Sequence, residues 1–197
     1  MKDEGGRMKI MAQSTLRLHL SSRRFGFALC AFLFLLLSST PSRAATWKKF
    51  APPGGQFSVL LPGVPKGERK INKDKDGTQT IDQDYTLETA DRLYMIGYQE
   101  HDAEVAKFIN VAALLDEMVK TVAREASGKL KSRRTLRVNG FDGREVVAAI
   151  EGGGTLRFRV FWTGRRLYTA LAAFPKRAGA NADALRFLQS LSLAKNR

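Results

Sequence analysis

Short turns that contain glycine divide most of the chain, and their spacing is the feature that most limits its fold. They lie at Pro62–Gly63, Lys73–Gly77, Asn139–Gly140, Gly152–Gly154 and Gly164. Most of these turns separate runs rich in β-branched and aromatic residues, which is typical of β-hairpins. Because loops this short connect antiparallel neighbours, the spacing predicts an antiparallel sheet.

The runs between the turns predict the individual strands. They cover residues 57–61, 64–71, 78–89, 92–99, 134–138, 143–150, 155–163 and 166–173. The polar run 64–71 is expected at an edge of the sheet, and the apolar run 92–99 near its centre. Within 155–163, apolar residues alternate with Arg157 and Arg159. This period of two places the apolar residues in the core and both arginines in water.

Two segments change to a helical period. Beyond Asp102, apolar residues recur every three or four positions, which predicts one long amphipathic helix that ends at Gly128. Either Asp102 or Asn110 is a candidate for its N-cap. Residues 182–191 predict a last helix, capped by Asn181. The order of elements predicts an α+β fold, in which a long central helix and a C-terminal helix flank an antiparallel β-sheet.

The first 44 residues have the pattern of a secretory signal peptide. Thirteen uncharged residues, Phe25–Leu37, follow Arg23 and Arg24 and precede small residues that end at Ala44. A membrane-spanning helix needs about 20 apolar residues, so cleavage after Ala44 is favoured over a retained anchor. We therefore expect residues 45–197 to form a single α+β domain that is secreted or periplasmic, with no stable transmembrane span after cleavage.

Composition limits the chemistry available to that domain. With 44% hydrophobic and 26% charged residues, the chain is neither disordered nor collagen-like. Its single cysteine, Cys30, lies inside the uncharged run, so the exported domain has no thiol for catalysis or for a disulfide. His101 is the only histidine beyond the cleavage site, and no nucleophile-elbow sequence accompanies it. We interpret His101 as a surface residue and expect no catalytic residue, metal site or cofactor.

Some acidic residues form patterns that come close to functional motifs. The segment Asn72–Gly77 copies the front of a calcium-binding loop, but Gln83 stands where a bidentate Glu should close it, which favours a plain hairpin turn. Carboxylates also occur in pairs two positions apart, at Asp82, Asp84, Glu100 and Asp102. A hydrolase or metal-dependent enzyme that uses His101 and these acidic residues is the alternative hypothesis.

Charge is the most informative feature for function. Residues 45–126 carry 11 Lys/Arg and 13 Asp/Glu, net −2, whereas residues 127–197 carry 15 and 4, net +11. If the basic residues of the second half meet in space, they form a surface that attracts anions, although a solvated basic face is the plainer interpretation. The candidate residues for binding an anion or a partner are Lys129, Lys131, Arg133, Arg134, Arg157 and Arg159.

These observations favour a secreted, non-catalytic binding or accessory domain of the cell envelope. Anionic lipid, polysaccharide or an acidic protein would suit both the charge and the compartment. Nucleic acid suits the charge but not the compartment, and no motif of interleaved aromatic residues is present. A further hypothesis is a structural subunit of an envelope complex, which would expose an apolar patch around Trp47 and Phe50.

Three segments resemble the PsbP-like superfamily, which includes secreted bacterial proteins of unknown role. They are the strand Gly55–Pro62, with the pattern Gly-Gln-Phe-Ser-Val-x-x-Pro, the turn Val138–Gly143 and the closing segment Phe187–Leu193. The resemblance covers most of residues 46–194 and implies an antiparallel sheet flanked by helices. It implies no shared activity, because function resides in sites rather than in folds.

Overall fold

The computed structural model describes residues 46–74, 77–125, 129–150, 153–176 and 180–194. The expected signal peptide and Gly128, the expected end of the long helix, lie outside these residues. None of the helices in the described ranges has the length and apolar character needed to cross a membrane.

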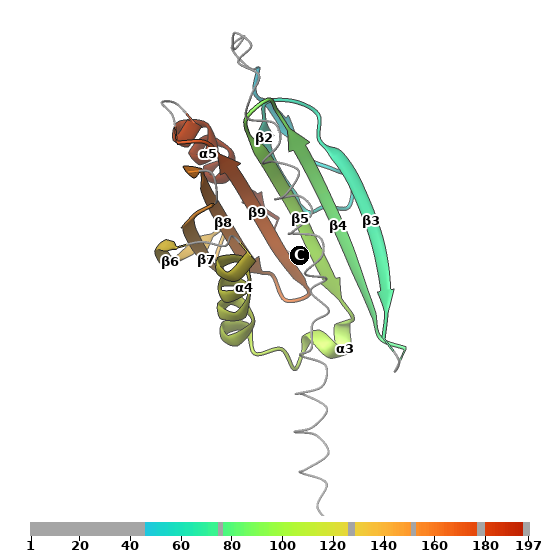
Figure 1. Ribbon diagram of the computed structural model, residues 1–197. Coiled ribbons are helices and arrows are strands. Elements are labelled where there is room, and N and C mark those ends of the chain that lie inside the picture. The colour runs from blue at the N-terminus through green and yellow to red at the C-terminus, as the bar shows by residue number, and fades with distance from the viewer. Residues whose placement is uncertain (1–45, 75–76, 126–128, 151–152, 177–179, 195–197) are drawn as a thin grey trace, which may run out of the picture.

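Seven antiparallel strands form one large sheet (Figure 1). They are β3 (Lys66–Lys73), β4 (Gln79–Glu88), β5 (Leu93–His101), β6 (Leu130–Val138), β7 (Phe141–Ala149), β8 (Thr155–Trp162) and β9 (Arg166–Phe174). Their order across the sheet is β3-β4-β5-β9-β8-β7-β6, so β3 and β6 are its two edges. The predicted antiparallel sheet and the α+β class are therefore confirmed.

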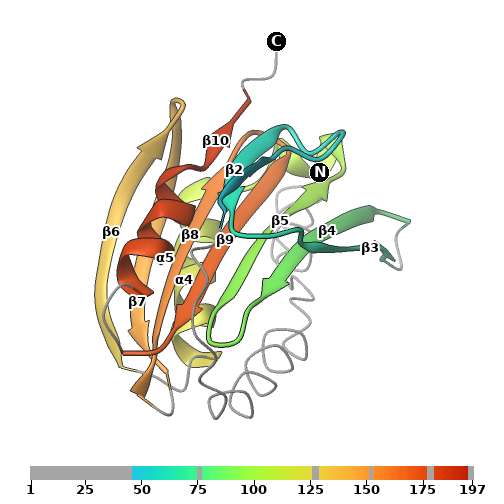
Figure 2. The same cartoon turned by 90° about the horizontal axis from the view of Figure 1, so that it is seen from above.

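The remaining elements cover the two faces of this sheet. They are the strands β1 (Lys48–Phe50), β2 (Phe57–Leu61) and β10 (Ser192–Leu193) and the helices α3 (Ala103–Ala106), α4 (Val111–Glu125) and α5 (Ala180–Gln189). Strands β1, β2 and β10 pair as a small antiparallel sheet. Helix α4 contacts β7 and β8, whereas α5 contacts β9 and β2. Figure 2 shows α5 in front of the large sheet and α4 behind it.

A separate hydrophobic core lies on each face. Leu115 and Met118 of α4 share one core with Phe158 of β8. Phe187 of α5 shares the other with Tyr168 of β9 and with the small sheet. Alternate residues of β8 and β9 supply the two cores, so these central strands are buried on both faces.

Two helices rather than one occupy the segment after Asp102: the predicted long helix begins after Asn110, one of its two candidate caps, and the short α3 precedes it. The Asp102 carboxylate accepts a hydrogen bond from the Glu104 backbone N–H, 2.9 Å away, and caps the short α3. The Asn110 side-chain oxygen accepts from the Ala113 N–H at 3.1 Å, at the start of α4. Both candidate caps are therefore real, each for its own helix. Asn181, by contrast, lies inside α5 and does not cap it.

The exposed apolar patch that the structural-subunit hypothesis places around Trp47 and Phe50 is not found at these residues. Both side chains are half-buried and pack against the second core. The Phe50 ring lies 4.9 Å from the Tyr85 ring, and the Trp47 ring lies 5.9 Å from that of Tyr94, in edge-to-face arrangements. These aromatic residues therefore fasten β1 to the large sheet.

Candidate anion-binding site

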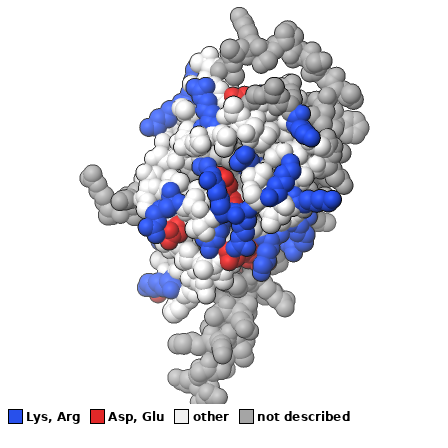
Figure 3. Space-filling model, turned by 90° about the vertical axis from the view of Figure 1, so that its left-hand side faces the viewer, with Lys and Arg blue, Asp and Glu red and all other residues white. Residues whose placement is uncertain are grey.

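The basic residues of the second half gather on the side of the molecule that carries edge strand β6. Lysine and arginine side chains outnumber acidic ones on this side in Figure 3, where the acidic atoms lie in small groups among them. Most of β6 is exposed, and the strand carries no Asp or Glu. We call the basic residues on and beside this strand the β6 cations: Lys129, Lys131, Arg133, Arg134 and Arg137.

The three arginines among the β6 cations each pair with a carboxylate. Arg133 contacts Asp116 at 2.5 Å, and Arg137 contacts Asp142 at 2.8 Å. Both pairs are exposed and stabilise the fold weakly. Arg134 reaches the buried Glu145, with 2.7 Å between nitrogen and oxygen. Among the residues that the structure describes, Lys129 and Lys131 have no carboxylate partner.

The prediction that Arg157 and Arg159 lie in water is wrong. Arg159 is only 5% exposed, and the Arg157 side chain is 19% exposed. The alternation of apolar residues with arginines in β8 indicates exposed arginines only if one face of the sheet is solvated. Here α5 covers that face of β8. Arg159 therefore belongs to the buried network beneath α5, and it cannot contact a partner at the surface.

That network joins three arginines to one glutamate. Arg134, Glu145 and Arg159 occupy paired positions on the neighbouring strands β6, β7 and β8. Arg159 Nε donates to Glu145 Oε2 at 2.5 Å, while Arg134 bonds to Oε1 at 2.8 Å. Arg157 Nη1 lies 3.8 Å from Oε1, beyond hydrogen-bond distance.

The charge of this network does not balance. Burial alone would raise the pKa of Glu145, but hydrogen bonds from Arg159 and Arg134 outweigh burial and hold the pKa below its ordinary value. Glu145 is therefore ionised at neutral pH. The single negative charge of Glu145 then faces three guanidinium groups. It neutralises that of Arg157 least, because Arg157 lies farthest from the carboxylate.

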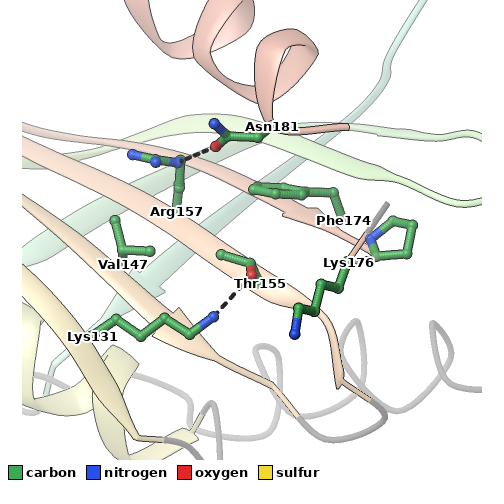
Figure 4. A pocket seen from close by; sticks show the side chains of 8 residues that line it. Lys131, Val147, Thr155, Arg157, Phe174, Lys176 and Asn181 are labelled. Carbon is green, nitrogen blue, oxygen red and sulfur yellow. Dashed lines mark hydrogen bonds between the residues drawn. The ribbon is translucent and has the colours of Figure 1, made fainter. Parts of the chain in front are cut away.

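Arg157 lines a pocket of about 490 Å³ beside the network (Figure 4). The lining residues are Lys131, Val147, Thr155, Arg157, Phe174, Pro175, Lys176 and Asn181. Three of them are cations, and none of the described lining residues is acidic. We call this the cationic pocket.

Two hydrogen bonds position the polar groups of the cationic pocket. Arg157 Nε donates to the Asn181 side-chain oxygen at 3.0 Å, and Lys131 Nζ donates to Thr155 Oγ1 at 3.2 Å. Lys131 and Lys176 approach from opposite sides of Thr155 in Figure 4. Asn181 lies in the first turn of α5, whose positive dipole end adds to the potential on this side. Such an arrangement suits an anion.

Of the six predicted binding residues, the structure brings only some together. Lys131 and Arg157 line the cationic pocket, and Lys129, Arg133 and Arg134 lie along β6 outside it. Lys176 and Asn181 are pocket residues that sequence reasoning missed. Lys176 follows the predicted strand 166–173 in the short basic pair Lys176-Arg177, and the only signal for it was the basic character of the second half.

The prediction that His101 lies at the surface is wrong as well. His101 is 7% exposed, and its ring lies 5.6 Å from the ring of Trp162. Burial lowers the pKa of His101, so the imidazole is neutral at pH 7. In the described part of the chain, Nε2 of His101 has no hydrogen-bond partner.

The acidic residues of the alternative hypothesis are engaged in the sheet. Asp82 accepts hydrogen bonds from Asn72 at 2.8 Å and from Gln99 at 2.9 Å, and Glu100 pairs with Arg165 and Arg166. Across the described ranges, no three His, Cys, Asp or Glu residues cluster in a way that would hold a metal ion. Asp76 of the calcium-loop pattern lies outside those ranges.

The architecture described above, an antiparallel sheet with helices in an α+β arrangement, is PsbP-like. Among solved structures, the chain is similar to the solution structure of cyanobacterial PsbP (CyanoP) from Synechocystis sp. PCC 6803. The match has a TM-score of 0.51 and 13% sequence identity, and it covers 80% of this chain and 98% of that chain. At this identity the likeness shows the fold alone. No family model and no curated protein matches the chain.

Proposed function

We propose that this protein is a secreted, non-catalytic binding or accessory domain of the cell envelope and that its β6 side contacts an anionic partner. An anionic lipid surface, an acidic polysaccharide and an acidic protein are the partner classes that suit this side. The observation that carries the proposal is the convergence of three arginines on the single carboxylate of Glu145. This convergence leaves positive charge beside a pocket whose described lining is free of Asp and Glu.

The β6 cations extend that positive charge along an edge of the molecule. Charges within about 10 Å of one another act together at moderate ionic strength, so Lys129 and Lys131, which have no carboxylate partner among the described residues, repel each other and the neighbouring arginines wherever these are not fully compensated. An anionic partner would remove this repulsion. The same potential would also speed its diffusional encounter with the β6 side.

The compartment in this proposal rests on the signal-peptide pattern of residues 1–44. Sequencing the amino terminus of the native protein from periplasmic and culture fractions tests it, and Ala45 is the expected first residue. Native protein recovered from the cytoplasm with an intact amino terminus would contradict export.

Binding is tested with β6 cations that lie outside the cationic pocket. The variant Lys129→Gln/Arg133→Gln/Arg137→Gln removes three exposed cations and leaves Glu145 with its partners. The expected result is a loss of about tenfold or more in affinity for phosphatidylglycerol vesicles or for an acidic polysaccharide, with a flatter salt dependence. Co-sedimentation at several salt concentrations measures both quantities.

A matched variant controls for net charge alone. Lys48→Gln/Lys66→Gln/Lys73→Gln removes three exposed lysines from β1 and from β3, the opposite edge of the large sheet. This variant should bind like the unmodified protein. If the two triple variants lose affinity equally, or if the unmodified protein shows no salt-sensitive binding, the β6 side is not the binding surface.

A further inference from the structure

We propose that the cationic pocket binds a phosphate monoester group, carried either by a soluble small molecule or by a lipid headgroup. This inference rests on the proposed anion-binding function and assigns it a defined site and ligand chemistry. The groups that would contact the phosphate are Arg157, Lys131 and Lys176.

Arg157 is the central group of the site because Asn181 orients its side chain and its charge is only partly compensated by Glu145. Its Nε donates to the Asn181 side-chain oxygen at 3.0 Å, which orients the guanidinium. Both oxygens of Glu145 already accept from Arg134 and Arg159. The terminal N–H groups of Arg157 therefore remain to donate, and a guanidinium donates best to a phosphate or a carboxylate.

The two lysines distinguish phosphate from carboxylate. Lys131 and Lys176 lie on either side of Thr155, and Arg157 lines the same pocket from the neighbouring outward position on β8, with its guanidinium beside Asn181 (Figure 4). A carboxylate is planar and is satisfied by one guanidinium. A phosphate monoester has three free oxygens and carries a charge of about −1.5 to −2 at pH 7, which suits three cations.

The rest of the pocket indicates that the ligand is larger than phosphate itself. Val147, Phe174 and Pro175 form apolar lining beside the cations. The pocket is a surface hollow, broadly open to solvent, and its volume of about 490 Å³ leaves room for a group larger than phosphate. The carbon part of a phosphorylated small molecule or headgroup would contact these apolar side chains.

Titration of the full exported domain, followed by ¹⁵N NMR including the arginine Nε–H signals, tests this inference. The probes are inorganic phosphate, glycerol 3-phosphate and acetate. The expected result is saturable shifts at Arg157 and Asn181 with both phosphates, tighter binding of glycerol 3-phosphate and at least tenfold weaker binding of acetate. Equal affinity for acetate, or shifts that do not saturate, would overturn the phosphate assignment.

Arg157→Gln and Lys176→Gln are the site variants, and Lys66→Gln is the matched control on β3. Each site variant should weaken phosphate binding by about tenfold or more, whereas the control should not. Unchanged phosphate binding in both site variants overturns the inference, even if the β6 cations still bind anionic vesicles. Vesicles with phosphatidic acid, a lipid phosphate monoester, then identify the source. If the protein prefers phosphatidic acid vesicles over phosphatidylglycerol vesicles, and Arg157→Gln abolishes this preference, the ligand is a lipid headgroup. If the protein binds the soluble phosphates but shows no such preference between vesicles, the ligand is a small molecule.

Discussion

Arg159 Nη1 donates a hydrogen bond to the backbone carbonyl oxygen of Leu188, 2.7 Å away, and so joins strand β8 to the last turn of α5. Carbonyl groups in the last turn of a helix have no partner within the helix. The same guanidinium also holds Glu145, so one side chain satisfies a helix end and a buried carboxylate together. This arrangement explains why Arg159 is buried in the middle of β8.

Replacing this arginine should be severely destabilising. Arg159→Leu leaves Glu145 buried with fewer partners and leaves the Leu188 carbonyl unpaired, so we expect a loss of about 3–5 kcal/mol in the free energy of unfolding. The double variant Arg159→Leu/Glu145→Leu should recover part of the loss, because it removes the stranded charge. Urea denaturation measures both. The exposed Arg137→Leu is the control, and a loss as large as that of Arg159→Leu would contradict this account.

Glu145 should make the protein less stable in acid. Its folded-state pKa is lower than its ordinary value of 4.5, so the folded state binds fewer protons than the unfolded chain. The stability it contributes is fully present above about pH 4.5 and is lost as the pH falls through the folded-state pKa. Denaturation at a series of pH values should show this slope. Glu145→Gln should reduce it, and Glu117→Gln on the exposed face of α4 should leave it intact.

His101 should contribute a second loss of stability at a higher pH. Burial lowers its pKa below the ordinary value of 6.5, although the nearby Asp82 opposes the shift. Its stabilising effect is therefore complete above about pH 6.5 and is lost as the pH falls through the folded-state pKa. His101→Phe keeps an aromatic ring beside Trp162 and removes the titration. Between pH 7 and 5, the free energy of unfolding of this variant should change less with pH than that of the unmodified protein. Equal slopes would rule out this role for His101.

The turn between β6 and β7 should be sensitive to substitution at Asn139. Asn139 has a φ of 51° and Gly140 a φ of 91°, as a tight hairpin turn requires. The Asn139 side-chain oxygen also accepts from the Leu193 N–H at 3.0 Å, which ties β10 to this hairpin. Asn139→Ala should cost about 1–2 kcal/mol and speed hydrogen exchange at the Leu193 amide. Asn139→Gly, which keeps the turn, should speed that exchange with a smaller loss of stability.

The strands were largely predictable, whereas the burial of charged residues was not. Turn chemistry is local, so the predicted run 57–61 coincides with β2, and the run 155–163 closely matches β8. The break between α3 and α4 was hidden because Asp102 and Asn110 both have capping side chains and the apolar period continues across the gap. The burial of Arg159 depends on α5 packing over β8, a long-range contact that no local pattern contains.

The candidate site was predictable only as a charge imbalance. Clustering of basic residues in the second half indicated the β6 side, because most of them lie on consecutive hairpin strands. The cationic pocket combines side chains from β6, β8 and the segment after β9, which are distant in sequence. Lys176 became part of it only through the pairing of β8 with β9.

The charges on β6 have a consequence for how copies of this protein meet. An edge strand has unpaired backbone groups that invite another strand, and rows of lysine and arginine oppose such pairing. The opposite edge, β3, also carries Lys66, Arg69, Lys70 and Lys73. Both open borders of the sheet therefore carry mainly basic side chains, which disfavour the approach of two molecules border to border. Such charge is one of the means by which native sheets avoid growing through their edges into larger aggregates.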